Sequence, residues 1–369
     1  MSALTVLMLI VGLIALVLGA EGLVRGAARL AARTGMSSVV IGLTVVAFGT
    51  SAPELAVSVG DSIRGGDEAG SIAIGNVVGS NIANILLVLG VAAAVGGSLL
   101  VAQRIVRLDV PIMIGVSVLL FVLVLDEELG RVEGVLLVVL LVAYIVWTVV
   151  AATRGSAPAV VAEYDEALDP EKLAASPVIA DIGFLVAGLG LLVVGSQALV
   201  NSASDIAGAL GVSDLVIGLT VVAIGTSLPE VATSVLAAIR GERDLAVGNA
   251  IGSNLFNLMA VLGITAAVSP NALPVAASAV QVDIPVMIAV AVACLPVFAN
   301  GQVLNRWEGV VFLALYVGYI LWLVLDANDH GFSDAYGSTM VFVVIPVVAV
   351  TITVMWARGR YRRLDALEN

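Results

Sequence analysis

The sequence predicts an all-α polytopic membrane protein, made of two inverted five-helix repeats and one extra C-terminal transmembrane helix. Hydrophobic residues account for 60% of its 369 residues, charged residues account for only 12%, and the mean hydropathy is +1.13. A water-soluble globular protein does not carry this much apolar surface. One helical span needs roughly 20 residues, so the apolar residues supply about eleven spans and leave no room for a large domain outside the membrane.

Eleven apolar stretches are long enough to cross a bilayer as helices, and we predict one span for each. Polar residues and charges separate them. The predicted spans are 3–20, 39–60, 74–96, 109–125, 134–152, 179–200, 214–237, 247–268, 283–299, 309–325 and 339–356.

The basic residues predict the orientation. If the N-terminus lies outside, 14 of the 16 Lys and Arg residues fall in inward-facing links or in the C-terminal tail, and only Arg64 and Arg131 face outward. Basic residues concentrate on the cytoplasmic side of membrane proteins. We therefore expect an outside N-terminus, a cytoplasmic C-terminus and a multi-pass protein of the cell's inner (plasma) membrane.

Two pairs of motifs recur in the same order in the two halves of the chain. Residues 41–54 (IGLTVVAFGTSAPE) recur as 217–230 (IGLTVVAIGTSLPE), and residues 75–84 (GNVVGSNIAN) recur as 248–257 (GNAIGSNLFN). Weaker echoes extend the match over five spans in each half. Because five is odd, the second copy must enter the membrane upside down, which is the inverted-repeat architecture of many secondary transporters.

The repeats divide the chain into four predicted parts. An acidic segment with three prolines separates them, and its length and charge are typical of a solvated cytoplasmic linker. The parts are a first five-helix repeat over 1–152, an acidic cytoplasmic linker over 153–178, a second, inverted five-helix repeat over 179–325, and an extra transmembrane helix with a basic tail over 326–369.

Composition excludes several functions. The net charge of -12 argues against nucleic acid as a partner. The chain has a single histidine, His330, and a single cysteine, Cys294, which removes most histidine-based catalysis and His-ligated zinc chemistry. We expect no enzymatic activity, no cofactor and no obligatory protein partner, so the lipid bilayer and the transported ions are the expected partners.

Two glutamates, Glu54 and Glu230, fall well inside the second and seventh predicted spans. A carboxylate within the membrane is costly and is a functional candidate by default. Pro53 and Pro229 precede them. Because proline has no N–H, a helical carbonyl four residues earlier loses its donor, and we expect the adjacent turn to open and leave carbonyl oxygens beside each carboxylate.

Neutral oxygen-bearing residues surround the two glutamates in both motifs. Helical spacing places Ala47 and Ser51 on the face of Glu54, and it places Thr50 one turn away; a third span supplies Ser80 and Asn84. The second half repeats this set with Ala223, Thr226, Ser227, Ser253 and Asn257. Hard oxygen ligands without thiolate or imidazole favour Ca²⁺ or Na⁺ over zinc or copper.

The charge of this predicted site limits what it can hold. Two carboxylates among neutral oxygens carry a charge of −2, which one Ca²⁺ or two Na⁺ would neutralise. An uncompensated pair would instead take up protons. Occupancy by Ca²⁺ and by monovalent cations would then be mutually exclusive, as an antiporter requires.

On these paired motifs the chain resembles a sodium/calcium exchanger of the calcium/cation antiporter superfamily, of the prokaryotic type. The resemblance covers about residues 3–325 and implies a central ion-binding core across which the long first and sixth helices slide. It implies that Glu54 and Glu230 are the main Ca²⁺ ligands with the carbonyls of Thr50 and Thr226. It further implies Na⁺ positions lined by Ser51, Ser227, Ser80 and Ser253 with the carbonyls of Ala47 and Ala223, and a centre completed by Asn84 and Asn257.

The expected function is therefore antiport of Ca²⁺ out of the cytoplasm against inward Na⁺, by alternating access at a midplane site. Some family members carry aspartate at the position of Asn257, so the present core has two carboxylates and proton involvement stays open. The alternatives are a Ca²⁺/H⁺ exchanger that uses the same glutamates, a passive cation channel, and an intramembrane hydrolase.

Two smaller expectations concern charged residues outside this core. Glu21 and Arg25 are four residues apart and are expected to pair on the first helix. Asp109 and Asp283 each stand two residues before a proline and are expected to start helices.

Overall fold

The computed structural model describes residues 3–34, 36–64, 71–155, 178–209, 223–299 and 301–327. Within these residues eight helices are long and apolar enough to cross a membrane, or up to nine if the bent pair Ser38–Thr50 and Ala52–Ile63 is one span. The predicted all-α membrane class is confirmed. The seventh predicted span is described only in part, and the eleventh, 339–356, lies outside the described residues with most of the predicted linker, so the count of eleven stays a prediction.

Helices account for nearly all of the described chain, and π-helical turns (η) interrupt several of them. The first half contains α1 (Ala3–Thr34), α2 (Ser38–Ile41), η1 (Gly42–Val46), α3 (Ala47–Thr50), α4 (Ala52–Arg64), α5 (Ser71–Ala83), η2 (Asn84–Leu89), α6 (Gly90–Gly96), β1 (Leu99–Leu100), η3 (Ile105–Asp109), α7 (Val110–Leu123), β2 (Glu128–Leu129) and α8 (Arg131–Gly155). The second half contains α11 (Val178–Ala209), α13 (Ala223–Thr226), α14 (Leu228–Ile239), α15 (Arg243–Phe256), η5 (Asn257–Val261), α16 (Leu262–Val268), β3 (Leu273–Pro274), η6 (Ala279–Asp283), α17 (Ile284–Ala299), β4 (Val303–Leu304) and α18 (Arg306–Ala327).

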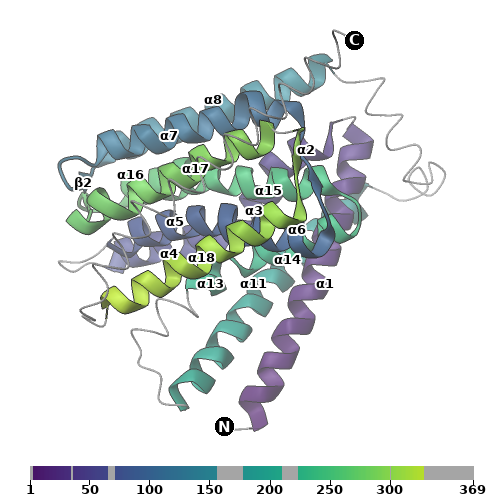
Figure 1. Ribbon diagram of the computed structural model, residues 1–369, viewed down its shortest axis with the longest axis horizontal. Coiled ribbons are helices and arrows are strands. Elements are labelled where there is room, and N and C mark those ends of the chain that lie inside the picture. Colours follow the sequence, from purple (N-terminus) through teal and green to yellow (C-terminus); the bar gives the residue numbers. More distant parts are fainter. Residues whose placement is uncertain are drawn as a thin grey trace.

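Two helical spans form the centre of the bundle. In the apolar stretches of Ile72–Gly96 and Arg243–Val268, 78% and 83% of the residues are buried, whereas the other candidate spans have 22–39% buried. The central spans carry the second motif of each repeat. Figure 1 shows most of the remaining helices running in a similar direction around them, while α1 and α11 cross the stack at a steep angle.

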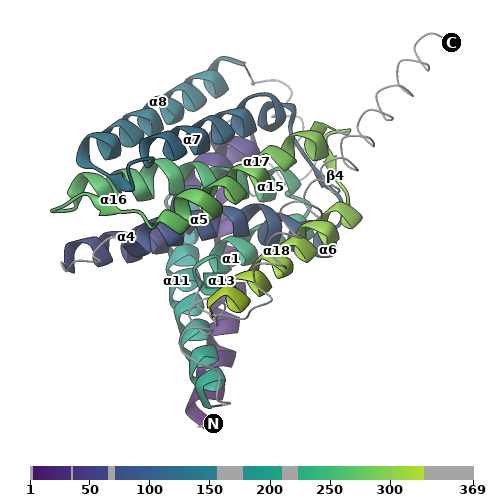
Figure 2. The same cartoon turned by 60° about the vertical axis from the view of Figure 1, so that its left-hand side comes forward.

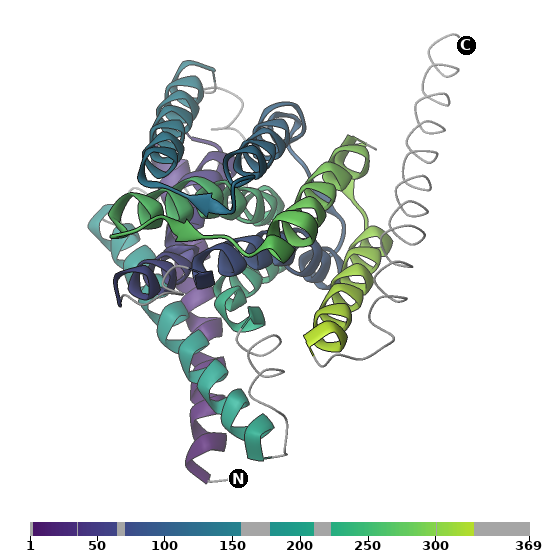
Figure 3. The same cartoon turned by 90° about the vertical axis from the view of Figure 1, so that its left-hand side faces the viewer.

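The helices α1 and α11 are longer than the apolar runs that predict them. Each contains 32 residues, or about 48 Å at 1.5 Å per residue, whereas the hydrocarbon core of a bilayer is about 30 Å thick. The apolar pattern of α1 ends near residue 20, but alanine, leucine and arginine favour helix and continue it to Thr34. Figures 2 and 3 show both helices projecting together beyond one side of the bundle, with the N-terminus at the projecting end.

A line of glycines joins α1 to α11 at seven-residue spacing. A Cβ on Gly12 would lie 2.9 Å from the carbonyl oxygen of Gly195, and a Cβ on Gly19 would lie 2.8 Å from that of Gly188. The two helices are antiparallel. Gly188 and Gly195 lie 176 residues after Gly12 and Gly19, which is the offset between the repeats, so the two contacts are equivalent in the repeats. Without side chains at these positions the two backbones can approach closely, which is how membrane helices gain packing contacts.

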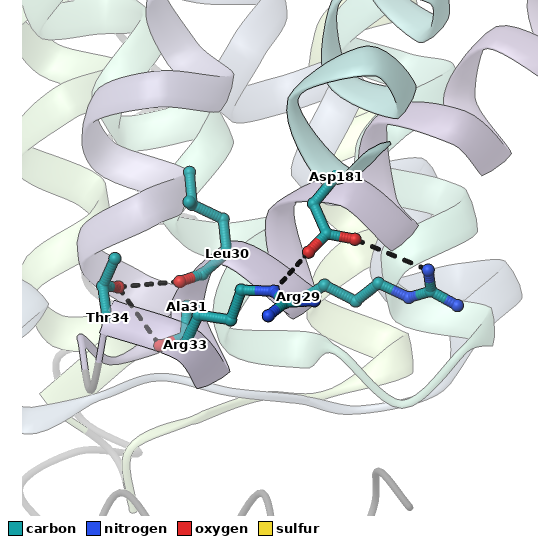
Figure 4. Close-up of polar contacts among 6 residues, drawn as sticks. All are labelled: Arg29, Leu30, Ala31, Arg33, Thr34 and Asp181. Atoms are coloured by element: carbon teal, nitrogen blue, oxygen red, sulfur yellow. Dashed lines mark hydrogen bonds and ion pairs between the residues drawn. The ribbon is translucent and has the colours of Figure 1, made fainter. Parts of the chain in front are cut away.

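A buried carboxylate fastens one end of this helix pair. Asp181 is fully buried, and its oxygens contact Arg33 Nε at 2.5 Å and Arg29 Nη1 at 3.5 Å (Figure 4). A buried charge is tolerated only when it is paired. The two arginines from the polar end of α1 therefore meet the single acid near the start of α11 and hold the helices together there.

The expected pairing of Glu21 with Arg25 on α1 is present. A second partner was not predicted: Arg240, from the turn after α14, binds the other oxygen of Glu21 at 2.6 Å. This contact joins α1 to the core of the second half.

Two short antiparallel strand pairs connect the halves at the ends of the bundle. Strand β1 pairs with β4, and β2 pairs with β3. By position in the repeats, β1 is equivalent to β3 and β2 to β4, so every strand pairs with the non-equivalent strand of the other half. Strands β1 and β2 lie at opposite ends of the span 105–123. Because β4 lies beside β1 and β3 lies beside β2, each strand lies at the opposite end of the bundle from its equivalent in the other half. An upside-down second copy has this arrangement.

The expectation for Asp109 and Asp283 is wrong. Both residues end a π-helical turn inside a continuous span, so neither starts a helix. The proline that follows tolerates this position because the π-turn already changes the backbone bonding. Asp109 is buried and accepts a hydrogen bond from Tyr144 at 3.0 Å, and Asp283 accepts one from Tyr319 at 3.2 Å.

The glycine line makes a testable prediction about stability. Gly188→Ala would place a Cβ 2.5 Å from the backbone nitrogen of Leu23, so the helices must separate. We expect the midpoint of thermal unfolding in detergent to fall by about 2–4 °C, as overpacking costs about 1–3 kcal/mol. Gly190→Ala on the same helix is the matched control, because a Cβ there meets no described atom within 4 Å. An equal midpoint for the two variants would contradict close packing along this line.

Candidate functional site

The helix that carries each glutamate is broken three residues before it. Helix α3 ends at Thr50 and α4 begins at Ala52, with a bend of 41° between the two segments. Ser51 at the break has φ −83° and ψ 1°, and Ser227 between α13 and α14 has nearly the same angles, −88° and 3°. The opened turn predicted from Pro53 and Pro229 is therefore present in both halves.

The partner helices carry a second irregularity that the sequence analysis did not predict. The π-turn η2 begins at Asn84, and η5 begins at Asn257, the equivalent residue. A π-turn widens the helix by one residue and leaves its backbone bonds irregular, and such turns occur often at functional sites. Helix α4 contacts η5, and α14 contacts η2. Each glutamate helix therefore packs against the asparagine turn of the other half.

Hydrogen bonds connect the two halves beside this crossing. The hydroxyl of Thr50 donates to Asn249 Oδ1 at 3.1 Å and lies 3.2 Å from the hydroxyl of Ser253. Asn81 and Asn254 also exchange hydrogen bonds, each amide nitrogen donating to the backbone oxygen of the other residue at 3.3 and 3.2 Å. Residues 81 and 254 are equivalent in the repeats, so this pair marks the axis that relates them.

Both carboxylates are completely buried and lie close enough for each to feel the charge of the other. Within the described part of the chain, neither Glu54 nor Glu230 has a hydrogen-bond partner for either carboxylate oxygen. The side-chain oxygens of Ser51, Ser227, Asn84 and Asn257 are also buried without such a partner. Most buried polar groups in proteins are satisfied, so a symmetric cluster of unsatisfied oxygens points to a ligand that binds them.

The remaining predicted ligands fall around this cluster. Thr50, Ser80 and Ser253 are buried. Ala47 is the first residue of α3, and its carbonyl accepts a hydrogen bond from the backbone N–H of Ser51 at 3.0 Å. Thr226 is half-buried at the end of α13. Ala223 begins α13, and its side chain lies outside the described residues. The ligand role of each residue stays a prediction.

Glycines in the second motif permit the close approach of α15 to the first half. A Cβ on Gly248 would lie 2.9 Å from the carbonyl of Val39, and one on Gly252 would lie 2.7 Å from the Cβ of Ala47. Helix α15 therefore lies directly against the chain that leads into the break at Ser51. The equivalent glycines of the first repeat do not pack in this way, because a Cβ on Gly75 or Gly79 would meet no described atom within 4 Å.

Four polar residues that recur in the two repeats tie the helices together. Asn76 donates to the hydroxyl of Ser58 at 3.1 Å, and the equivalent Asn249 donates to that of Ser234 at 3.0 Å. Each bond links the helix of a glutamate to the helix of the following motif. The recurrence of all four residues in both repeats was the available signal.

A small hollow adjoins the first break. Its lining includes Ser51 and two aromatic rings, Phe48 and Phe256, whose centroids are 5.8 Å apart. The other lining residues are Ala52, Leu55, Ala260 and Val261. The hollow is apolar apart from Ser51, so it borders the polar cluster and offers few ligands of its own.

The arrangement can bind hard cations. It supplies two carboxylates and several neutral oxygens from hydroxyl, amide and carbonyl groups, as Ca²⁺ and Na⁺ require. Among the described residues, no group of three or more His, Cys, Asp or Glu side chains is placed to hold a metal ion. The charge at this site therefore comes from the two glutamates.

Comparisons with known proteins agree with this chemistry. A family model described as sodium/calcium exchanger protein matches residues 4–150 and 181–325. The chain is 36% identical over 352 residues to the sodium/calcium exchanger MaX1 of Methanosarcina acetivorans, covering 87% of this chain and 99% of that protein. It is 35% identical over 322 residues to the inner membrane protein YrbG of Escherichia coli, covering 86% of this chain and 95% of that protein.

The fold is also similar to a solved exchanger structure. The sodium-calcium exchanger NCX_Mj, soaked with 2.5 mM Na⁺ and 0.1 mM Ca²⁺, superposes with a TM-score of 0.72 at 33% sequence identity, covering 87% of this chain and 99% of that chain. The family match spans both motif pairs and most of the described helices. The chain belongs to the sodium/calcium exchanger protein family, whose members are membrane antiporters.

Proposed function

We propose that this protein exports Ca²⁺ from the cytoplasm in exchange for inward Na⁺, by alternating access at the site between Glu54 and Glu230. One observation carries the proposal: two fully buried carboxylates share a site with neutral oxygens that lack hydrogen-bond partners in the described structure. The total charge of −2 matches one Ca²⁺ or two Na⁺. The exchangers similar to this chain, one of them solved in Na⁺ and Ca²⁺, support the choice of ions.

The coupling follows from competition for the same oxygens. A cation that neutralises both carboxylates leaves no charge for another, so Ca²⁺ and Na⁺ occupy the site in turn. Transport against a gradient then requires only that the inward-open and outward-open states differ in their relative affinity for Ca²⁺ and Na⁺. The unloaded, doubly charged site is costly in a low-dielectric interior, which disfavours crossing without a cation and prevents leak.

The proposed ligands of each ion are those that the resemblance to sodium/calcium exchangers implies. The carboxylates of Glu54 and Glu230 and the carbonyls of Thr50 and Thr226 bind Ca²⁺ at the centre, with Asn84 and Asn257 beside it. The hydroxyls of Ser51, Ser80, Ser227 and Ser253 and the carbonyls of Ala47 and Ala223 line the flanking Na⁺ positions. Both sets use the opened turns, where backbone oxygens become available.

The membrane arrangement in this proposal has eleven spans in two inverted repeats, with the N-terminus outside and the C-terminus in the cytoplasm. The distribution of basic residues and the pairing of non-equivalent strands support it. The name of the relative YrbG, an inner membrane protein, supports the inner membrane as the location. In that orientation a Na⁺ gradient directed inward drives Ca²⁺ outward.

The site assignment predicts the effect of neutralising either glutamate. We expect Glu54→Gln and Glu230→Gln each to lower Na⁺-driven Ca²⁺ uptake into proteoliposomes by at least about 10-fold, because a bond to a charged group is worth about 1.5–3 kcal/mol or more. Glu128→Gln is the matched control, since this exposed glutamate lies in β2 at the end of the bundle. Near-normal uptake by either core variant would refute the assignment.

A Ca²⁺/H⁺ exchanger is the second candidate, because two buried carboxylates without a compensating Lys or Arg contact among the described residues can also bind protons. The two functions separate in vesicles with imposed gradients. We expect a Na⁺ gradient at clamped pH to drive Ca²⁺ uptake, and a pH gradient without Na⁺ to drive none. Uptake driven by the pH gradient alone would establish proton coupling in place of Na⁺ coupling. Failure of either gradient to move Ca²⁺ uphill would favour a passive channel.

A further inference from the structure

A chain of hydrogen bonds runs from the backbone of α15 to the break that precedes Glu54. The hydroxyl of Ser234 donates to the carbonyl of Ala246 at 3.3 Å, the amide nitrogen of Asn249 donates to Ser234 Oγ at 3.0 Å, and the hydroxyl of Thr50 donates to Asn249 Oδ1 at 3.1 Å. Ser234, Asn249 and Thr50 are fully buried. This chain of hydrogen bonds therefore connects the second repeat to a residue at the ion site.

The first bond of this chain fixes the direction of all the others. A backbone carbonyl can only accept, so the single proton of Ser234 is directed at Ala246, and Ser234 must accept from its other neighbour. That neighbour must then be the NH₂ group of Asn249, which turns the amide oxygen toward Thr50. Because an amide oxygen only accepts, Thr50 is the donor of its bond to Asn249 at 3.1 Å; the carbonyl of Ala47, at 3.4 Å, is the more distant acceptor for the same proton.

The direction of the last bond matters for cations, since a cation is bound by lone pairs and repelled by protons. With its proton held by Asn249, the hydroxyl oxygen of Thr50 keeps two lone pairs. The hydroxyl of Ser253, 3.2 Å away, uses at most one of them. Thr50 also lies beside the carboxylate of Glu230. With its proton donated to Asn249, the hydroxyl oxygen of Thr50 can face the same cation as an oxygen of Glu230.

We propose that Asn249 is a positioning residue of the ion site, which holds the proton of Thr50 away from the site so that the hydroxyl oxygen faces the cation. Asn249 itself binds no ion. The proposal rests on the function proposed above and adds a residue, one step removed from the ligands, that sets their affinity for Ca²⁺.

The first repeat provides a matched control. The equivalent Asn76 donates to the hydroxyl of Ser58 at 3.1 Å and to the backbone oxygen of Glu54 at 3.3 Å. Asn76→Ala therefore removes the same kind of bond between neighbouring helices as Asn249→Ala but leaves the bond of Thr50 intact. A general loosening of the helices would affect both variants alike, and loss of hydroxyl orientation would affect Asn249→Ala alone.

The test is a double-mutant cycle on the purified full-length protein, with Ca²⁺ binding measured by calorimetry and Na⁺-driven Ca²⁺ uptake measured in proteoliposomes. We expect Asn249→Ala and Thr50→Val each to weaken Ca²⁺ binding about tenfold, the lower range for a hydrogen bond to a charged group. The double variant should bind no more weakly than the weaker single variant, because both changes remove the same oriented oxygen. The maximal uptake rate of Asn249→Ala should change by less than about twofold while its half-saturating Ca²⁺ concentration rises.

Unchanged Ca²⁺ binding in Asn249→Ala would overturn the proposal, and so would effects of the two substitutions that multiply in the double variant. If Asn249→Ala does not fold, Ser234→Ala decides the question. This substitution frees the amide of Asn249 to rotate, so we expect Ca²⁺ binding to be about threefold weaker. In the Thr50→Val background it should cause no further loss of Ca²⁺ binding. Ca²⁺ binding by Ser234→Ala equal to that of the wild type would overturn the proposal. Calorimetry keeps the two proposals separate, because a wild-type protein that binds Ca²⁺ but shows no Na⁺-driven uptake contradicts only the proposed function.

Discussion

The rest of the structure depends on the cost of burying two negative charges inside a membrane protein. Glu54 and Glu230 are both fully buried and lie close to each other. In a low-dielectric interior such a pair is tolerated only with counter-charges or with ions that neutralise it. The surrounding side chains are neutral oxygen carriers, so in the proposed function the transported cations supply the counter-charge. A site that is stable only when loaded is a suitable basis for obligatory exchange.

The helix irregularities place backbone and side-chain oxygens where this charge lies. The breaks at Ser51 and Ser227 and the π-turns that begin at Asn84 and Asn257 occur in pairs related by the repeat. Each glutamate helix packs against the π-turn of the other half, and the bonds from Thr50 cross the same boundary. The site therefore lies where the two repeats meet.

The sequence was sufficient for features that depend on residue type and spacing. Apolar length predicts the spans, proline predicts the broken turns, and recurrence singles out Glu54 and Glu230. It was not sufficient where one residue's bonding depends on a distant partner. The apolar run does not predict the full length of α1, whose last arginines pair with Asp181 across 148 residues. A π-turn differs from an α-helix by a single backbone bond, so residue type and spacing do not predict it. The proposed role of Asn249 depends on its contact with Thr50, which only the structure shows.

In the proposed function, Ca²⁺ and Na⁺ compete for one site of charge −2. Equilibrium Ca²⁺ binding to the purified protein, measured at increasing Na⁺ concentration, tests it most directly. We expect one Ca²⁺ per chain, complete displacement of Ca²⁺ by saturating Na⁺, and no complex that holds both ions. Ca²⁺ that stays bound at saturating Na⁺, or two Ca²⁺ bound per chain, would contradict a single shared site between Glu54 and Glu230.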